Sequence, residues 1–227
     1  MAVTPTQVAD GVHVGPLFPR NMFNTVILEG SSGDVVVDAG PPWSGRRLAR
    51  FLQGRDVIEH VVTHAHGDHV GSSAWLCNHT GASLAMSEIE ADDFEHGSIN
   101  YHANRLGKYL VAPMGRKRRT VDRRLKEGDT VAGFQVLAQP GHSPGLLAFW
   151  RESDRTLIVG DGPINLSADP TSPRWLHLPR KLHHDPTEAV ASRWRMTDLE
   201  PDLIVSTHGY PVRGLDRWVE GIRTVAH

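Results

Sequence analysis

Four side chains that bind metal ions well stand close together in the run His64-Ala65-His66-Gly67-Asp68-His69. Residues 57 to 63 predict a strand that leads directly into this run. Residues two apart in an extended chain point the same way, so His64 and His66 can hold one ion from the strand end. Gly67 lets the backbone turn, and the aspartate and histidine that follow then face a neighbouring point from the start of the next helix. The run predicts a metal site rather than a polar surface loop.

Three more candidate ligands share one kind of position, directly after a predicted strand or turn and beside glycine. His142 lies in the rigid turn formed by residues 140 to 145, Asp161 follows residues 157 to 160, and His208 precedes Gly209. Any one of them alone would be an ordinary loop residue. Their common placement at strand ends adds them to the first four. The predicted ligand set is therefore His64, His66, Asp68, His69, His142, Asp161 and His208.

Imidazole and carboxylate ligands without a thiolate suit Zn²⁺, with Fe or Mn as alternatives. Cys77 is the only cysteine, so neither a cysteine cluster nor an intramolecular disulfide can form. Two ions about 3.5–4 Å apart can share one water and lower its pKa from 15.7 to roughly 7. The second ion can also stabilise an oxyanion, and Asp68 is a candidate catalytic residue that takes or passes a proton. This chemistry predicts hydrolysis.

The elements expected to position these residues are strands and helices in a mixed order. We expect strands at 11–14, 25–29, 35–37, 57–63, 131–138, 146–150, 156–159 and 203–206. We expect helices at 44–53 with Ser44 as N-cap, at 72–79, from the Asp185-Pro186-Thr187-Glu188 start to about 199, and at 216–225. Strands with a helix, a middle insertion, and strands with a helix again favour two sheets flanked by helices. No Gly-x-Gly-x-x-Gly follows the first strands, which argues against a dinucleotide fold.

Length and composition fit a single globular domain of 227 residues, with 39% hydrophobic and 22% charged residues. The formal net charge of -2 argues against nucleic acid or an anionic membrane as a partner. The N-terminal residues lack a secretory pattern, and the apolar runs are too short to span a bilayer. We expect a cytoplasmic protein.

With these residues in place, the chain resembles the metallo-β-lactamase fold superfamily, whose signature is matched by the run that begins at His64. The resemblance implies a four-layer αββα sandwich of the α/β class, with a dinuclear site at one edge, and one domain over residues 1–227. It implies that one metal is held by His64, His66 and His142, the other by Asp68, His69 and His208, and that Asp161 bridges them. Asp38 matches the first motif of the superfamily and would orient the ligand loop from outside the ligand set.

Comparison with individual branches of the superfamily limits which of their activities this chain can be expected to share. A bridging aspartate such as Asp161 is generally missing from true metallo-β-lactamases, and flavodiiron proteins usually carry Glu where this chain has His66. Glyoxalase II is similar in its metal motifs but usually has a C-terminal helical extension that is not seen here. Acyl-homoserine lactonases commonly place a tyrosine where this chain has residues 162 to 164. Candidates to replace that tyrosine are Tyr101, Tyr109 and Tyr210.

Residues 88–126 form a predicted substrate-loop or lid insertion. Residues 116 to 126 include seven basic side chains and one acidic. One interpretation is a solvated basic helix face. The other is that Arg116, Arg118 and Arg119 contact an anionic group, such as the phosphates of coenzyme A or of a carrier-protein arm. Outside this segment, we interpret His183 and His184 as surface or capping residues rather than ligands.

The sequence thus predicts a dinuclear hydrolase for a carboxyl ester, thioester or lactone of a small-molecule or acyl-carrier substrate. Two alternatives stay open. One is a phosphodiesterase or nuclease of the same fold, which would require the basic segment to follow a nucleic-acid backbone. The other is a non-catalytic binding or regulatory protein with a vestigial site.

Overall fold

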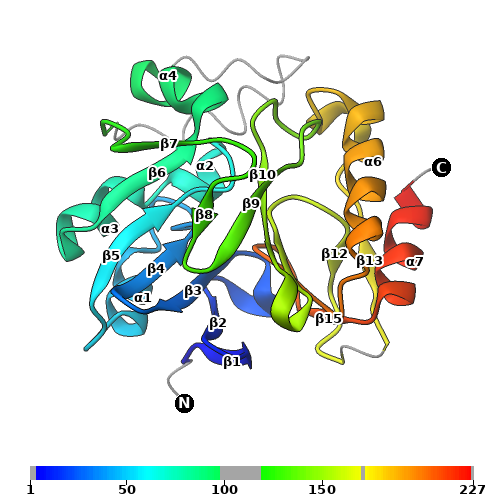
Figure 1. The fold of residues 1–227 in the computed structure, drawn as a ribbon, viewed down its shortest axis with the longest axis horizontal. Coiled ribbons are helices and arrows are strands. Elements are labelled where there is room, and N and C mark those ends of the chain that lie inside the picture. Colours follow the sequence, from blue (N-terminus) through cyan, green and yellow to red (C-terminus); the bar gives the residue numbers. More distant parts are fainter. Residues whose placement is uncertain (1–3, 98–118, 170–171, 226–227) are drawn as a thin grey trace.

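Two β-sheets face each other at the centre of the computed structural model, which describes residues 4–97, 119–169 and 172–225 (Figure 1). The first sheet has seven strands in chain order, antiparallel from β1 to β4 and parallel from β4 to β7. Its strands are β1 Thr6–Ala9, β2 Val12–Pro16, β3 Asn24–Gly30, β4 Gly33–Val37, β5 Val57–Val61, β6 Ser83–Ser87 and β7 Arg123–Leu125.

The second sheet has the order β15-β14-β11-β10-β9-β8, and only β11 and β14 pair in parallel. Strands β12 and β13 form a separate two-stranded sheet. The bounds are β8 Thr130–Val131, β9 Phe134–Ala138, β10 Leu147–Arg151, β11 Thr156–Val159, β12 Ile164–Asn165, β13 Trp175–Leu176, β14 Leu203–Ser206 and β15 Val212–Arg213.

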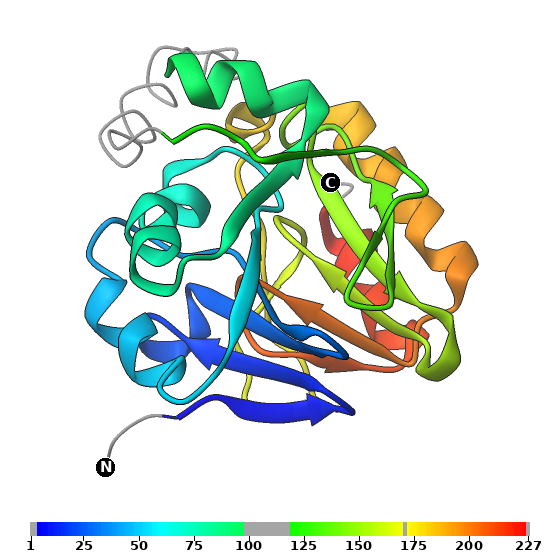
Figure 2. The ribbon, with the colours of Figure 1, turned by 60° about the vertical axis from the view of Figure 1, so that its left-hand side comes forward.

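Helices cover the outer faces of both sheets, as Figure 2 shows. The first sheet carries α1 Gly45–Phe51, α2 Gly67–Val70, α3 Ser73–Thr80 and α4 Glu88–His96, and the second carries α6 Pro186–Arg195 and α7 Leu215–Val225. Short 3₁₀ turns are η1 Pro19–Asn21, η3 Glu152–Asp154, η4 Arg180–Leu182 and η5 Met196–Leu199. None of the helices in the described ranges is long and apolar enough to cross a membrane.

Alternation along the strands divides the core into layers. In β3, Val26 and Leu28 pack between the two sheets, while Ile27 faces the opposite way and packs against Leu48 of α1. Successive strand residues point to opposite faces, so a strand covered on both sides must be apolar at every position. A further apolar cluster joins the second sheet to η5 and α7. The predicted αββα sandwich of the α/β class is therefore confirmed.

Most predicted elements lie within a few residues of the observed ones, with two corrections. The predicted strand 131–138 is two strands, because Ala132 and Gly133 have φ values of 46° and 82° and reverse the chain as a tight hairpin. The N-cap of α6 is confirmed, since the Asp185 carboxylate accepts the backbone N–H groups of Thr187 and Glu188. Ser44 does precede α1, but its hydroxyl makes no capping hydrogen bond. Of the predicted insertion 88–126, residues 98–118 lie outside the described ranges.

Candidate metal centre

Most of the candidate ligands follow strands that run parallel to one another, at the ends where those strands meet. Strands β4 and β5 are parallel and are followed by Asp38 and His64. Strands β11 and β14 are also parallel and are followed by Asp161 and His208. Because the carboxyl ends of parallel strands meet at the same edge, residues far apart in the sequence converge there. His142 comes from the loop between β9 and β10.

The loop that carries His142 is fitted closely to α6. Gly141 has a φ of 123°, and a Cβ atom there would lie 2.1 Å from the backbone nitrogen of Ala189. Only glycine allows this approach. The backbone N–H of His184 donates to the His142 carbonyl over 3.0 Å, which fastens the loop to the start of the helix.

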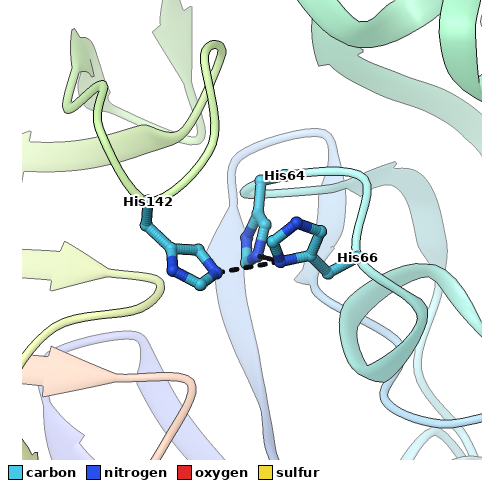
Figure 3. A group of neighbouring side chains, drawn as sticks. All are labelled: His64, His66 and His142. Carbon is cyan, nitrogen blue, oxygen red and sulfur yellow. Dashed lines mark hydrogen bonds between the residues drawn. The ribbon is translucent and has the colours of Figure 1, made fainter. Parts of the chain in front are cut away.

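Three buried imidazoles form the first group of candidate ligands (Figure 3). His66 Nδ1 lies 2.8 Å from His64 Nε2 and 2.8 Å from His142 Nε2. A neutral ring nitrogen either donates or accepts one hydrogen bond. Three nitrogens that converge on one point are therefore satisfied better by a shared cation than by each other. The donor set fits a metal ion with nitrogen ligands.

The second group consists of Asp68, His69 and His208, whose ligand atoms lie within 4.8 Å of one another. The Nε2 atoms of His69 and His208 are 3.1 Å apart. Asp68 Oδ2 lies 3.8 Å and 3.6 Å from these two nitrogens and keeps 22% of its side chain exposed. Asp68 is thus the member of this group that solvent or a substrate can reach.

Asp161 lies between the two groups. Its Oδ2 is 3.1 Å from His142 Nε2, and its Oδ1 is 2.9 Å from His69 Nε2 and 3.1 Å from His208 Nε2. Burial would raise the pKa of this carboxyl, but the neighbouring histidines hold it well below its usual value. The structure therefore brings together all seven predicted ligands, with a carboxylate where a bridge would stand. Their roles as ligands stay predictions.

Asp38 lies behind His69, outside the group of candidate ligands. His69 Nδ1–H donates to Asp38 Oδ2 over 2.6 Å, and Asp38 also accepts the backbone N–H and the hydroxyl of Thr63, each over 2.8 Å. His208 is held in the same way, because its Nδ1 donates to the Met22 carbonyl over 2.6 Å. Each contact uses Nδ1 as the donor, so Nε2 is the ring nitrogen that faces the cluster.

His183 has a role that the sequence reasoning missed. Its interpretation as a surface or capping residue is wrong, because the side chain is buried and its Nδ1 lies 3.2 Å from Nδ1 of His142. The ring also donates to the Leu178 carbonyl. A neutral His183 then accepts from His142 Nδ1–H, which leaves His142 Nε2 free for a cation. His184 is exposed and contributes its backbone N–H to the same loop.

Glu90 of α4 was also missed, since it looked like one more acidic residue of a polar helix. Its side chain is fully buried. Oε2 accepts the backbone N–H of Ala65 over 2.6 Å, and Oε1 accepts that of Gly145 over 2.8 Å. Burial raises the pKa of this carboxyl, while these donors act in the opposite direction. Glu90 therefore ties the loop of His64 and His66 to the loop of His142.

The structure describes only some of the residues that were predicted to contact the substrate. Arg119 contacts Asn78 Oδ1 over 3.1 Å and lies 3.7 Å from Asp122 Oδ2. Tyr210 lines a separate pocket of about 210 Å³ with residues of β1 and β15. Their substrate roles stay predictions. The remaining candidates, Arg116, Arg118, Tyr101 and Tyr109, lie outside the described residues.

Comparison with known proteins places this site among metal-dependent enzymes. The family model described as the metallo-beta-lactamase superfamily matches residues 20–208, a range that includes every candidate ligand. The probable metallo-hydrolase YflN of Bacillus subtilis is 26% identical over 231 residues, which cover 92% of this chain and 87% of that protein.

Two further similarities concern chemistry and metals. Hydroxyacylglutathione hydrolase GloC of Haemophilus influenzae is 27% identical over 144 residues, which cover 60% of this chain and 64% of that protein. The crystal structure of TTHA1623 in a di-iron-bound form matches with a TM-score of 0.63 and 25% identity, over 93% of this chain and 94% of that chain.

Proposed function

Because the chain belongs to the metallo-beta-lactamase superfamily, we propose that it is a dinuclear metal hydrolase of carboxyl esters, thioesters or lactones. Family membership and the buried histidine and aspartate cluster support a metal-dependent hydrolase that uses divalent ions. The two-metal site, the choice of zinc and the class of bond are the finer proposal.

The position of Asp161 is the main observation that supports a two-metal site. One of its oxygens faces the first histidine group and the other faces the second, at 2.9–3.1 Å from the ring nitrogens. A carboxylate surrounded by histidines on both sides suits two cations that share it. His64, His66 and His142 would hold one ion, and Asp68, His69 and His208 would hold the other.

The donor set favours zinc. Every candidate ligand offers nitrogen or oxygen, and Cys77 packs in an apolar cluster rather than at the centre. A similar structure was obtained in a di-iron-bound form, so iron is the competing outcome for elemental analysis.

Two bound ions would lower the pKa of a shared water to about 7 and polarise the substrate carbonyl. The protein supplies the rest. His64, His69 and Asp38 are fully buried, which keeps bulk water from the inner side of the site. Asp68 is partly exposed beside His69 and His208, where its carboxylate can accept a proton from the attacking water and pass it to the leaving group.

The bond class rests on the donor chemistry and on one relative. An acylglutathione is a thioester, and a relative that shares 27% identity is named a hydroxyacylglutathione hydrolase. A small-molecule or acyl-carrier thioester is therefore the first substrate class to test, followed by lactones and oxygen esters.

A substrate panel with the metal-loaded protein tests the proposal. We expect turnover of a thioester or a lactone, and its loss in Asp161→Asn but not in the control Asp198→Asn, whose side chain is exposed. Turnover of bis-p-nitrophenyl phosphate alone would replace the proposal with a phosphodiesterase. No turnover by protein that contains two ions would favour a binding or regulatory role.

A further inference from the structure

A pocket of about 230 Å³ lies between α6, α7 and the segment around η4, outside the metal cluster. Its lining includes Arg180, Arg193, His177, His183 and Thr224. No aspartate or glutamate of the described ranges lines it. The pocket therefore carries the positive charge of its two arginines on a wall that also includes apolar residues such as Leu178 and Val190.

Arg193 is the central feature of this pocket. Only 2% of its surface is exposed. Within residues 4–97, 119–169 and 172–225, its guanidinium makes no hydrogen bond and no ion pair. Burial lowers the pKa of Arg193 to about 10, while the Asp161 carboxylate acts in the opposite direction from beyond ion-pair distance, so the group stays charged at neutral pH. A buried charge is costly unless a counter-charge or several hydrogen bonds accompany it.

Two more polar side chains line the same space. His177 Nε2 donates to the Thr224 hydroxyl over 2.8 Å, because that hydroxyl itself donates to the Gly221 carbonyl. The unpartnered Nδ1 of a neutral His177 is therefore an acceptor and does not contribute to anion binding. Arg180 lines the pocket from an exposed position, and it has no ion pair in the described part of the chain. One arginine thus lies inside the pocket and another lies at its solvent side.

We propose that this pocket binds a small oxyanion, either a phosphate or a carboxylate group, between Arg193 and Arg180. The planar guanidinium presents paired N–H donors that match the oxygens of both groups. The volume suits such a group with a few attached atoms rather than a large ligand. The site is separate from the metal ligands but shares a wall with them, since His183 lines the pocket and contacts His142.

Calorimetric titration of the metal-loaded protein with inorganic phosphate tests the site without any assay of hydrolysis. We expect Arg193→Gln and Arg180→Gln to weaken phosphate binding by about tenfold or more, because each removes a charge-assisted contact. The matched control is Arg195→Gln, on the same helix but exposed and paired with Glu188, and it should bind like the parent.

Several outcomes would overturn the proposal. One is parent-like phosphate affinity in both variants. A second is the absence of phosphate binding to the parent protein. A third is phosphate binding that disappears when the metal is removed but is the same in the parent and in both arginine variants. If Arg193→Gln melts far below the parent, Arg180→Gln decides alone, because its exposed side chain can be changed without disturbing the core.

Kinetics then identify the source of the oxyanion. If it belongs to the substrate, Arg180→Gln should raise KM for an anionic ester and leave a matched neutral ester unchanged. If it is a separate ligand, both esters should keep their KM values in the variant, and phosphate should change turnover of the neutral ester in the parent only.

Discussion

Replacing Glu90 with Gln should loosen both loops that carry the first group of histidines. The buried carboxylate accepts the backbone N–H groups of Ala65 and Gly145 over 2.6 Å and 2.8 Å. Glutamine has nearly the same shape but only one acceptor oxygen. Its amide nitrogen would face one of the two backbone donors, which would then be buried without a partner.

The size of the effect follows from these two contacts. A hydrogen bond to a charged acceptor contributes about 1.5–3 kcal/mol, and a buried unsatisfied donor costs about 1–3 kcal/mol. Relief from burying an ionised carboxylate offsets part of this loss. We expect a net destabilisation of about 2–4 kcal/mol, which for a chain of this length lowers Tm by roughly 5–15 °C. Metal affinity should fall about 10–100-fold, as for other groups that orient ligands.

Thermal unfolding of metal-loaded and chelator-treated protein, with competition against a chromophoric chelator, measures both quantities. Glu88→Gln is the matched control, because Glu88 lies on the same helix but is exposed. A Glu90→Gln protein that melts within about 1 °C of the parent and binds metal equally well would refute the role of Glu90 as a clamp.

Three further predictions concern the centre and its surroundings. Elemental analysis of protein purified without chelator should give about two metal ions per chain, because seven candidate ligands exceed the four of one tetrahedral zinc; one ion or none after growth with added metal would contradict this. Asp161→Ala should lower kcat/KM more than Asp38→Ala, whose loss should be about 10–100-fold, and equal losses would reject the bridging role. Burial raises the pKa of the Cys77 thiol from 9.0 to about 11, so the reactive thiolate is scarce at pH 8 and increases only as the pH approaches that value. A thiol reagent should therefore label Cys77 slowly until denaturant is added, and rapid labelling of the folded protein would argue against its burial.

The ligand cluster could be predicted because its signals are local. An apolar strand followed by alternating histidines specifies both where the side chains stand and which way they point. The same holds for the cap of α6, where Asp185 accepts two N–H groups from residues close to it in the sequence. Predictions failed where a local preference was overruled. Ala132 adopts a left-handed conformation that alanine rarely favours, so the hairpin between β8 and β9 had no clear sequence signal.

The residues that position the ligands were hidden for a different reason. Glu90 and Ala65 are 25 residues apart, and His142 and His183 are 41 apart, so each pair meets only after the chain has folded. Neither carries a motif. A glutamate in an acidic helix and a histidine before a cap both have ordinary surface interpretations, and only burial distinguishes them.

The outer contacts explain how the centre can be arranged before any ion binds. His69 is held by the Asp38 carboxylate, and His208 is held by a backbone carbonyl. His142 is held by His183, which itself donates to a backbone carbonyl. In all three cases Nδ1 is occupied by this outer contact, so Nε2 is the ring nitrogen that faces the cluster and an entering cation. Ions that enter such a site need not reorient the rings. The conformational entropy of these side chains is already lost when the protein folds, because the strands that carry them end at the same edge. A substitution behind a ligand should therefore weaken metal binding without touching the metal, and His183 belongs in that class with Asp38.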